Sequence, residues 1–278
     1  DINSDLPEDT EVYIVEAGAR VKGDIYEISQ LLHQHIAVVG KIGPAHIEYF
    51  KSLENIARTK LELIQSSRLE KAFVHVSATD EKHEKVEFFG EEVKDLSSSL
   101  DGLKFTLELG GKDVSFETSV LGSFQAMNIA AAVKVATYMG MPMEKIQEAV
   151  KSLNPVEHRL QRIDAGGKII LDDGFNGNLD GMKEGISLCA QHKGRKVIVT
   201  PGLVESSDEL NIELIEEINK VFDIVIVTGA LNAELFDEYL KVDKKVILSD
   251  KSKLTETLAQ LTASGDVILF ANDAPNFI

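Results

Sequence analysis

The sequence is poor in basic residues, which narrows the range of its partners. It contains 29 Lys and Arg against 46 Asp and Glu, a formal net charge of -17. Proteins that bind nucleic acid by general electrostatic attraction need basic side chains to neutralise phosphates, so the charge argues against such a partner. An acidic protein can still bind a nucleotide locally, through a few cations, backbone amides and Mg²⁺.

Long apolar runs are also lacking. Runs such as residues 196–200 and 223–228 are far too short to span a bilayer, and the first residues lack the basic and apolar pattern of a signal peptide. The sequence therefore predicts a cytoplasmic protein with no membrane span. The single cysteine, Cys189, lies in a helical pattern without a neighbouring base and orienting residue, so we interpret it as a small buried apolar residue.

Two phosphate-binding motifs do not occur. The sequence has no GxxxxGK[ST], the phosphate loop, and no GxGxxG after a strand, the dinucleotide fingerprint. It also starts with Asp1, and residues 11–17 (EVYIVEA) have the pattern of a buried strand with no fold-opening elements before it. We therefore expect this chain to lack an N-terminal part that includes the phosphate loop.

What the sequence does contain is an ordinary globular composition, with 44% hydrophobic and 27% charged residues. Its 278 residues exceed the usual size of one core, which favours two compact units. In the first half, short β-branched runs alternate with helical periods, a pattern typical of a parallel sheet covered by helices. The expected elements are strands at 11–17, 35–43 and 71–76, and helices at 24–33, 53–65, 123–138 and 143–153.

The character of the sequence changes at residues 80–120. The alternating segments VEFFG, LKFTLEL and VSFETSV, separated by glycines, predict antiparallel hairpins. Asn154-Pro155 then reads as a hinge between a domain at 1–154 and one at 155–278. The second domain has five short apolar strands separated by helical stretches, which predicts a doubly wound, Rossmann-like α/β domain. These strands are expected at 168–173, 196–200, 223–228, 245–249 and 266–270.

Candidate site residues follow the predicted strands, because ligands of open parallel sheets bind beyond the carboxyl ends of the strands. Glu16 ends one strand and His46 follows the next, so the two side chains could share a divalent cation, with a capping Glu and a surface His as the alternative. Lys60 lies on the following helix, where a solvated lysine is the ordinary interpretation.

The segment 172–178 (DDGFNGN) follows a predicted strand and precedes a helix. Its carboxylates and small residues are suited to holding a ribose hydroxyl or a phosphate. It also reads as an Asx-rich turn in which Asn178 or Asp180 caps the helix, and both interpretations can hold together.

Five segments in order carry a family resemblance: VEAGA, IGPAHIEYFKSLENIARTKLELI, MNIAAAV, PVEHRLQ and LDDGFNGNLDGM. Their combination resembles the Mur ligases, and within them the MurF type, which adds D-alanyl-D-alanine to UDP-MurNAc-tripeptide in peptidoglycan precursor synthesis. The resemblance implies an α/β fold made of the later part of a central ATPase domain, with a parallel and a small antiparallel sheet, followed by a Rossmann-like ligase domain. ATP and Mg²⁺ are the implied cofactors.

The resemblance also implies roles for individual residues. Glu16 and His46 match Mg²⁺ ligands, and Lys60 matches a lysine that is commonly carbamylated, where the added carboxylate helps to bind a second Mg²⁺. These three are the implied catalytic residues. Those implied to bind the nucleotide are Asn128, Arg159 and Asp173, and those implied to bind substrate are Asn176 and Asn178.

The chain departs from the family pattern at two places near these residues. A His-Asn pair usually stands where this chain has Phe124 and Gln125, and Phe175 and Leu179 replace a tyrosine and a proline. The implied protein is a monomeric ligase working through an acyl phosphate, and this chain by itself is expected to be inactive. A folylpolyglutamate synthase-like ligase and a non-catalytic module on the same scaffold remain the alternatives.

Overall fold

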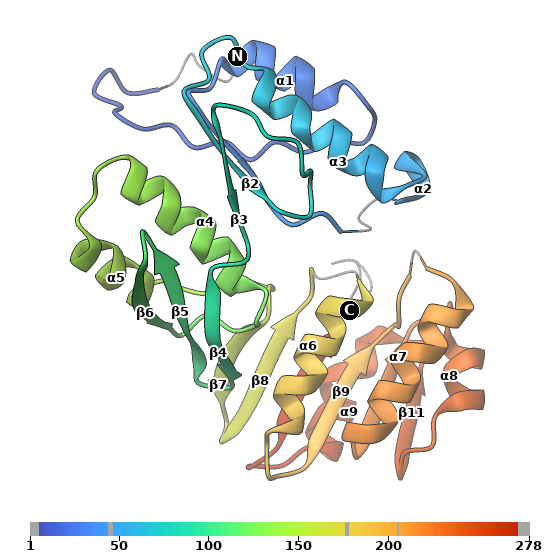
Figure 1. The fold of residues 1–278 in the computed structure, drawn as a ribbon. Coiled ribbons are helices and arrows are strands. Elements are labelled where there is room, and N and C mark those ends of the chain that lie inside the picture. Colours follow the sequence, from blue (N-terminus) through green and yellow to red (C-terminus); the bar gives the residue numbers. More distant parts are fainter. Residues whose placement is uncertain (1–5, 44–46, 176–177, 205, 272–278) are drawn as a thin grey trace. The chain divides into compact units, whose positions relative to one another are not determined.

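The computed structural model describes residues 6–43, 47–175, 178–204 and 206–271. The chain forms two compact units, unit 1 at residues 1–91 and unit 2 at residues 92–278 (Figure 1). This division lies at a different place from the domain boundary predicted at 154/155. The units are defined by spatial compactness and the predicted domains by sequence pattern, so the boundary at 154/155 stays a prediction.

Unit 1 is built around a three-stranded parallel sheet in the order β1-β2-β3. Buried side chains of the strands pack against α3, with Ile56 only 1% exposed, to form its core. The final turn of the predicted helix 53–65 is a 3₁₀ helix, η1, a common way for a helix to end. The elements are α1 (Asp24–Leu32), β1 (Ile36–Val39), α2 (Ile47–Phe50), α3 (Leu53–Leu61), η1 (Glu62–Gln65), β2 (Lys71–His75) and β3 (Val86–Phe89).

The predicted strand at residues 11–17 is wrong. The segment forms no strand, and its apolar side chains are exposed, with Ile14 at 89% and Val12 at 53%. A strand requires a hydrogen-bonded neighbour, and among the described residues this segment has none. The β-branched pattern alone therefore misled the prediction.

The predicted antiparallel hairpin at VEFFG is also wrong. This segment is β3, which pairs in parallel with β2 in the register Ala72 with Val86 and His75 with Phe89. Alternating apolar residues indicate a half-buried strand but say nothing about the direction of its partner. The change from parallel to antiparallel structure therefore falls after Phe89 rather than at residue 80.

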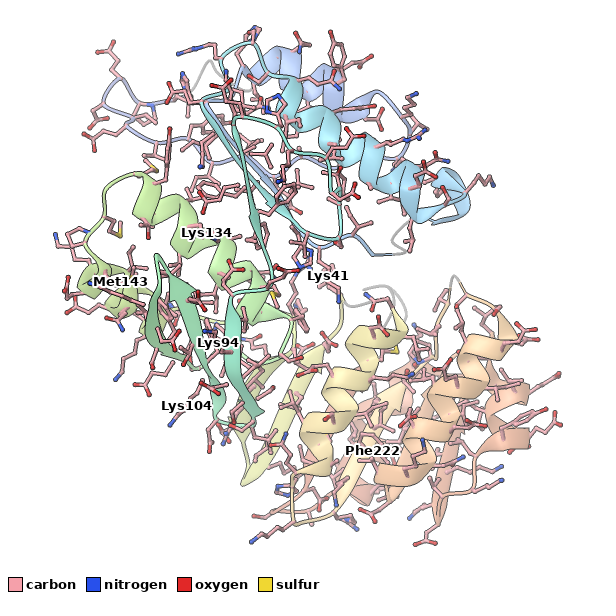
Figure 2. The ribbon with its side chains drawn as sticks, viewed as in Figure 1. Lys41, Lys94, Lys104, Lys134, Met143 and Phe222 are labelled. Carbon is pink, nitrogen blue, oxygen red and sulfur yellow. The ribbon has the colours of Figure 1, made fainter. Side chains whose placement is uncertain are left out.

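Unit 2 begins with the predicted antiparallel sheet, ordered β4-β5-β6. The helix α4 packs against this sheet, burying Ala126, Ile129 and Val133 in a common core. Lys134 of the same helix, labelled in Figure 2, pairs with Glu92 at 3.5 Å. The elements are β4 (Val93–Ser99), β5 (Gly102–Leu109), β6 (Lys112–Thr118), α4 (Gln125–Tyr138) and α5 (Met143–Lys151).

The remainder of unit 2 is a six-stranded sheet ordered β11-β10-β9-β12-β8-β7. All its pairs are parallel except that of β7 with β8, a hairpin that the sequence had not led us to expect. The five predicted strands are confirmed to within one residue. The elements are β7 (Gln161–Ala165), β8 (Lys168–Asp173), α6 (Leu179–Ala190), β9 (Lys196–Thr200), α7 (Asp208–Val221), β10 (Ile224–Thr228), α8 (Ala233–Tyr239), β11 (Lys244–Leu248), η2 (Lys251–Lys253), α9 (Leu254–Leu261) and β12 (Val267–Ala271).

Helices cover both faces of this sheet, which confirms the doubly wound prediction. Strand residues such as Ile198 and Val225 pack against α6, α7 and α8, whereas their neighbours Val197 and Ile224 face α9. From β9 the chain adds β10 and then β11 toward one edge of the sheet, and it then crosses back to β12 on the other side of β9. Because crossovers between parallel strands are right-handed, this reversal of direction places α9, which connects β11 to β12, on the opposite face from α7 and α8. No helix in the described part of the chain is long and apolar enough to cross a membrane.

Cys189 lies within the core between α6 and the sheet. It is fully buried, and this burial raises the pKa of its thiol to about 12. Its interpretation as a small buried apolar residue is confirmed. Phe222, labelled in Figure 2, belongs to the same core cluster.

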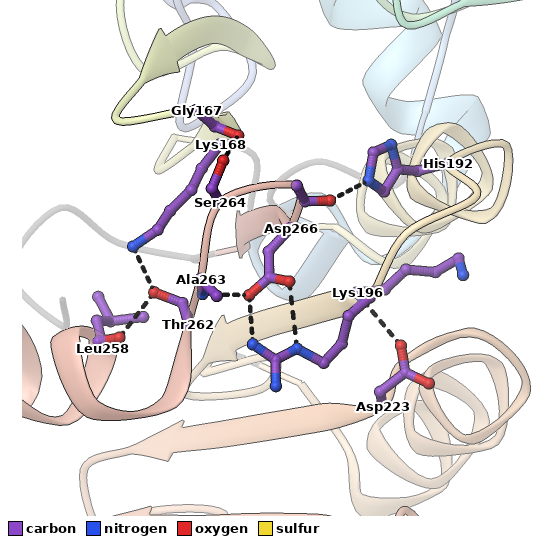
Figure 3. A network of polar contacts seen from close by, with 12 residues as sticks. Gly167, Lys168, His192, Lys196, Asp223, Leu258, Thr262, Ala263, Ser264 and Asp266 are labelled. Carbon is purple, nitrogen blue, oxygen red and sulfur yellow. Dashed lines mark hydrogen bonds and ion pairs between the residues drawn. The ribbon is translucent and has the colours of Figure 1, made fainter.

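A polar network joins the amino ends of three strands (Figure 3). The buried Asp266, just before β12, accepts hydrogen bonds from Arg195 at 2.8 and 3.2 Å and from the amide of Ala263 at 2.7 Å. Lys168 donates to Thr262 at 2.7 Å. These contacts tie the loop before β12 to β8 and β9, at the end of the sheet opposite to the strand ends where ligands bind.

Candidate functional site

Two consecutive carboxylates at the carboxyl end of β8 hold the loop 158–160 in place. Asp173 is 1% exposed, and its Oδ1 accepts a hydrogen bond from the Leu160 amide at 3.0 Å. Nδ1 of His158 lies 2.8 Å from Oδ2 of Asp172. The Phe175 amide donates to the His158 carbonyl at 3.1 Å. Both ends of the loop are therefore fixed to the last residues of β8, and His158 is also bound by Phe175 just after the strand.

The loop that these contacts hold has an uncommon backbone. His158 and Leu160 have φ values of 61° and 52°, in the left-handed region that non-glycine residues rarely adopt. Such conformations persist where the surroundings over-determine them, which is common at functional sites. Between them, Arg159 is exposed and makes no side-chain hydrogen bond or ion pair with any described residue. Its guanidinium is thus available to an anionic ligand.

The start of α4 adjoins this loop. Gly122 has a φ of 95°, and a Cβ there would lie 2.6 Å from the Phe124 ring and 3.2 Å from a Leu160 methyl group. Asn128, in the first turns of α4, is exposed and donates to Oε1 of Gln125 at 2.9 Å. The structure therefore brings the start of the helix that bears Asn128 next to the loop that bears Arg159.

Asn178 caps α6, as one of the two interpretations of DDGFNGN expected. Its side chain accepts a hydrogen bond from the Gly181 amide at 2.8 Å. This contact leaves open the substrate role implied by the resemblance, which stays a prediction. Asn176, the other implied substrate residue, lies outside the described residues.

The metal ligands predicted in unit 1 are only partly described. Glu16 is exposed and follows no strand, so the argument from strand ends does not apply to it. Lys60 is half-buried in the last turn of α3, without an ion pair to any described residue. His46 lies outside the described residues. Among those described, no group of three or more His, Cys, Asp or Glu could hold a metal ion.

Two carboxylates that the sequence analysis did not single out connect distant segments near the candidate residues. Glu62 accepts hydrogen bonds from the amides of Gly23 and Tyr26 at 3.1 Å, capping α1 from 39 residues away. Glu184 contacts the start of α4, as detailed below. The sequence offered only an indirect sign of these two contacts. Neither α1 nor α4 begins with a residue whose side chain caps it, so an acceptor from elsewhere in the chain was to be expected.

These features define a class of protein. Polar residues at the carboxyl edge of a doubly wound parallel sheet are the arrangement by which α/β proteins bind nucleotides and related ligands. Two family models divide nearly the whole chain between them, the Mur ligase middle domain at residues 2–136 and the Mur ligase glutamate ligase domain at residues 158–272. The chain belongs to the Mur ligase family.

Individual relatives agree with this assignment. The chain is 27% identical over 286 residues to the UDP-N-acetylmuramoyl-tripeptide--D-alanyl-D-alanine ligase of Bacillus subtilis, covering 95% of this chain and 62% of that protein. The structure of MurF ligase from Thermotoga maritima in complex with ADP matches with a TM-score of 0.76 and 26% identity, covering 94% of this chain and 63% of that one.

A more distant match shares the fold. Folylpolyglutamate synthase from Thermotoga maritima has a TM-score of 0.63 at 16% identity, covering 87% of this chain and 58% of that one. The chain thus spans less than two thirds of the length of each of these three proteins.

Proposed function

We propose that the complete product of the gene encoding this chain is an ATP-dependent ligase that joins D-alanyl-D-alanine to UDP-MurNAc-tripeptide. The observation that carries the proposal is the constrained loop 158–160, which presents Arg159 beside the carboxyl end of β8, its side chain making no hydrogen bond or ion pair with any described residue. The likeness to ligases that carry this name, one of them solved with ADP, supports the choice of nucleotide and substrates.

The proposed reaction has two steps. A carboxylate oxygen of the tripeptide attacks the γ-phosphorus of ATP, so that an acyl phosphate forms and ADP leaves. The amine of D-alanyl-D-alanine then attacks the acyl carbon, and inorganic phosphate leaves as the tetrahedral intermediate collapses to the amide. Neither step requires a protein nucleophile, and the only cysteine is buried with a raised thiol pKa.

The residues of unit 2 would bind and orient the nucleotide. The guanidinium of Arg159 is always charged and matches the geometry of phosphate oxygens, so it can neutralise charge on the transferred group. Asp173 fixes the backbone beside Arg159 through the Leu160 amide, and a carboxylate at this position is a hydrogen-bond acceptor of the kind a ribose hydroxyl requires. Asn128 offers an amide at the start of the adjoining helix.

Magnesium would be held by residues of unit 1. Glu16 offers an exposed carboxylate, and the amine of Lys60 has no ion-pair partner among the described residues, as a lysine awaiting carbamylation requires. His46 would supply a further ligand. This donor set fits Mg²⁺ once the carbamate and phosphate oxygens are added. Bound there, Mg²⁺ would neutralise charge on the phosphates and the carboxylate.

Phosphate release by the complete gene product tests the proposal. Release should require ATP, UDP-MurNAc-tripeptide and D-alanyl-D-alanine together. Arg159→Ala should lower kcat/KM by at least about tenfold, because a charge-assisted contact to phosphate is lost. Arg68→Ala, which removes another exposed arginine, should leave it unchanged. Release that depends instead on a folate and glutamate would favour the folylpolyglutamate synthase alternative, and no release with any substrate would favour a non-catalytic module.

The metal site has its own test. Lys60→Ala should depress turnover, with partial recovery on adding a small carboxylate that replaces the carbamate. His46→Ala should raise the Mg²⁺ concentration needed for half-maximal rate, because a neutral ligand is lost. The exposed Lys22 has no ion-pair partner among the described residues, and Lys22→Ala serves as the control. Wild-type turnover in Lys60→Ala would remove that residue from the mechanism.

The 278-residue chain alone should bind MgATP only weakly, because its sequence has no GxxxxGK[ST] to surround the β- and γ-phosphates. Calorimetry on the purified chain measures this directly. Micromolar affinity would contradict the expectation and would show that the 278-residue chain suffices for nucleotide binding.

A further inference from the structure

Helix α4 begins without a cap of its own. Its N-cap residue, Phe124, has no capping side chain, and no acidic residue lies in its first turn. The first amides of a helix have no partner within the helix, and its amino end carries a partial positive charge. The amides of Gln125, Ala126 and Met127 donate to the carbonyls of Gly122, Ser123 and Phe124, so what this helix end lacks locally is a negative charge.

Glu184, in α6, brings a negative charge to this helix end from 61 residues away, through its contacts with Ser123. Its Oε1 accepts from the Ser123 amide at 2.7 Å, and its Oε2 accepts from the Ser123 hydroxyl at 2.8 Å. The Ser98 hydroxyl, near the end of β4, also donates to Oε1 at 3.1 Å. All three donors are neutral groups, and no described cation pairs with this carboxylate. Its negative charge is thus left to act on the end of α4.

Close packing restricts the conformation of residues 121–124, the loop before α4. A Cβ at Gly122 would collide with the Phe124 ring at 2.6 Å and press on Leu160 at 3.2 Å, and the positive φ of Gly122 disfavours other residues. Leu121 and Leu160 are both buried in the core cluster that includes residues of α6. Packing and hydrogen bonding therefore attach the start of α4 to the same helix.

We propose that Glu184 is a positioning residue: it fixes the first turns of α4, and with them Asn128, to α6 and the segment after β8. For catalysis this assignment rests on the function proposed above, in which Asn128 and Arg159 face one nucleotide. The carboxylate touches neither of these side chains. It acts through Ser123, at the point where the antiparallel sheet region of unit 2 meets its six-stranded sheet.

Hydrogen exchange on the 278-residue chain tests the cap itself. In Glu184→Ala, the amides of residues 123–128 should exchange about tenfold faster, because a hydrogen bond to a charged acceptor is lost and the helix end frays. Glu184→Gln keeps an acceptor for the Ser123 amide and should show a smaller increase. Glu213→Gln, which removes a carboxylate paired with Lys183 on the same side of the sheet, is the matched control and should leave these amides unchanged.

A double-mutant cycle identifies the partner. If the carboxylate acts through the Ser123 hydroxyl as well as the amide, Ser123→Ala should have less effect in the Glu184→Ala background than in the wild type. Unchanged exchange at 123–128 in Glu184→Ala, or strictly additive effects of the two substitutions, would overturn the assigned contacts.

Kinetics of the complete gene product test the positioning role. Glu184→Ala should raise the KM for ATP severalfold while kcat per folded molecule changes less, and Glu184→Gln should restore much of the loss. A purely structural role would lower the folded fraction without changing KM, and that result would overturn the positioning role. If the wild-type protein shows no ligase activity, the proposed function fails together with this catalytic part, while the exchange result still decides whether Glu184 fixes the start of α4 through Ser123.

Discussion

Two apolar runs of similar composition differ in secondary structure and in burial. In unit 1, residues 12–15 (VYIV) form no strand and are exposed, Ile14 by 89%. In unit 2, β10 (IVIVT) is buried along its whole length, and its Val225, Ile226 and Val227 are fully covered. Side-chain chemistry does not distinguish these runs, because both are rich in β-branched residues that favour strands.

The difference lies in the neighbours. β10 pairs with β9 on one edge and β11 on the other, and helices cover both faces of its sheet. Residues 12–15 pair with no described strand, and their side chains are exposed. A strand is stabilised by pairs across the ladder and by burial, so the same pattern yields a core strand or an exposed segment according to its surroundings.

The largest effect should come from Ile226→Ala in the buried run. Removing a fully buried isoleucine from a central strand should lower the free energy of unfolding of unit 2 by about 2–5 kcal/mol, since transfer free energy is lost and a cavity remains. Reactivity of the Cys189 thiol against urea concentration measures the change, because this single buried cysteine in unit 2 becomes accessible only on opening. A loss below about 1 kcal/mol would show that the site collapses around the deletion.

A slightly smaller effect is expected from Asp266→Asn at the amino end of β12. Burial alone raises the pKa of this carboxyl, but the Arg195 guanidinium and the Ala263 amide more than offset it and hold the pKa below its ordinary value. The substitution should cost about 2 kcal/mol, the range for hydrogen bonds to charged groups. Asp237→Asn, which breaks an exposed pair with Lys245, should change stability by less than about 0.5 kcal/mol.

The pH dependence of the same group gives a second measurement. Because its folded pKa lies below the unfolded value of about 3.9, the stabilisation by Asp266 is fully present above that pH and is lost as pH falls through the folded pKa. Wild type and Asp266→Asn should therefore converge in stability only under strongly acidic conditions. Equal stability at neutral pH would contradict the proposed role of the network.

In unit 1, Glu62→Ala should have an effect of about 1–3 kcal/mol, since two amides at the start of α1 lose their acceptor. Hydrogen exchange of the amides at residues 23–27 localises the loss. Glu54→Ala removes an exposed carboxylate paired with Arg58 on α3 and provides the comparison. If both substitutions gave the same small change, the long-range cap would not stabilise the helix.

The smallest effect belongs to the exposed run. Ile14→Ala should leave stability within about 0.5 kcal/mol, because this side chain buries little apolar surface. Urea unfolding of the purified chain is sufficient as a measurement. A loss of unfolding free energy comparable to that of Ile226→Ala would mean that residues 12–15 are buried in solution. The two runs would then not differ in burial.

The sequence anticipated most of the six-stranded sheet because local pattern and tertiary role agree there. Each strand is a short apolar run between helices, and burial on both faces of a parallel sheet calls for just such runs. Residues 172–173 were likewise identified as a candidate site, because the carboxyl end of a parallel strand can be located from the local pattern and chain order alone. The cap formed by Asn178 was visible for the same reason, since it acts on its own helix.

The sequence by itself determined the composition of the core, the order of most helices and strands, and the family, because these depend on residues close together in the chain or on motifs in order. Only the tertiary structure decided that residues 12–15 pair with no described strand, that β3 runs parallel to β2, and that Glu62 and Glu184 accept hydrogen bonds at the starts of helices 39 and 61 residues away. Strand pairing and capping at such separations depend on which backbone groups the folded chain brings within hydrogen-bonding distance, and no local pattern of side chains records that distance.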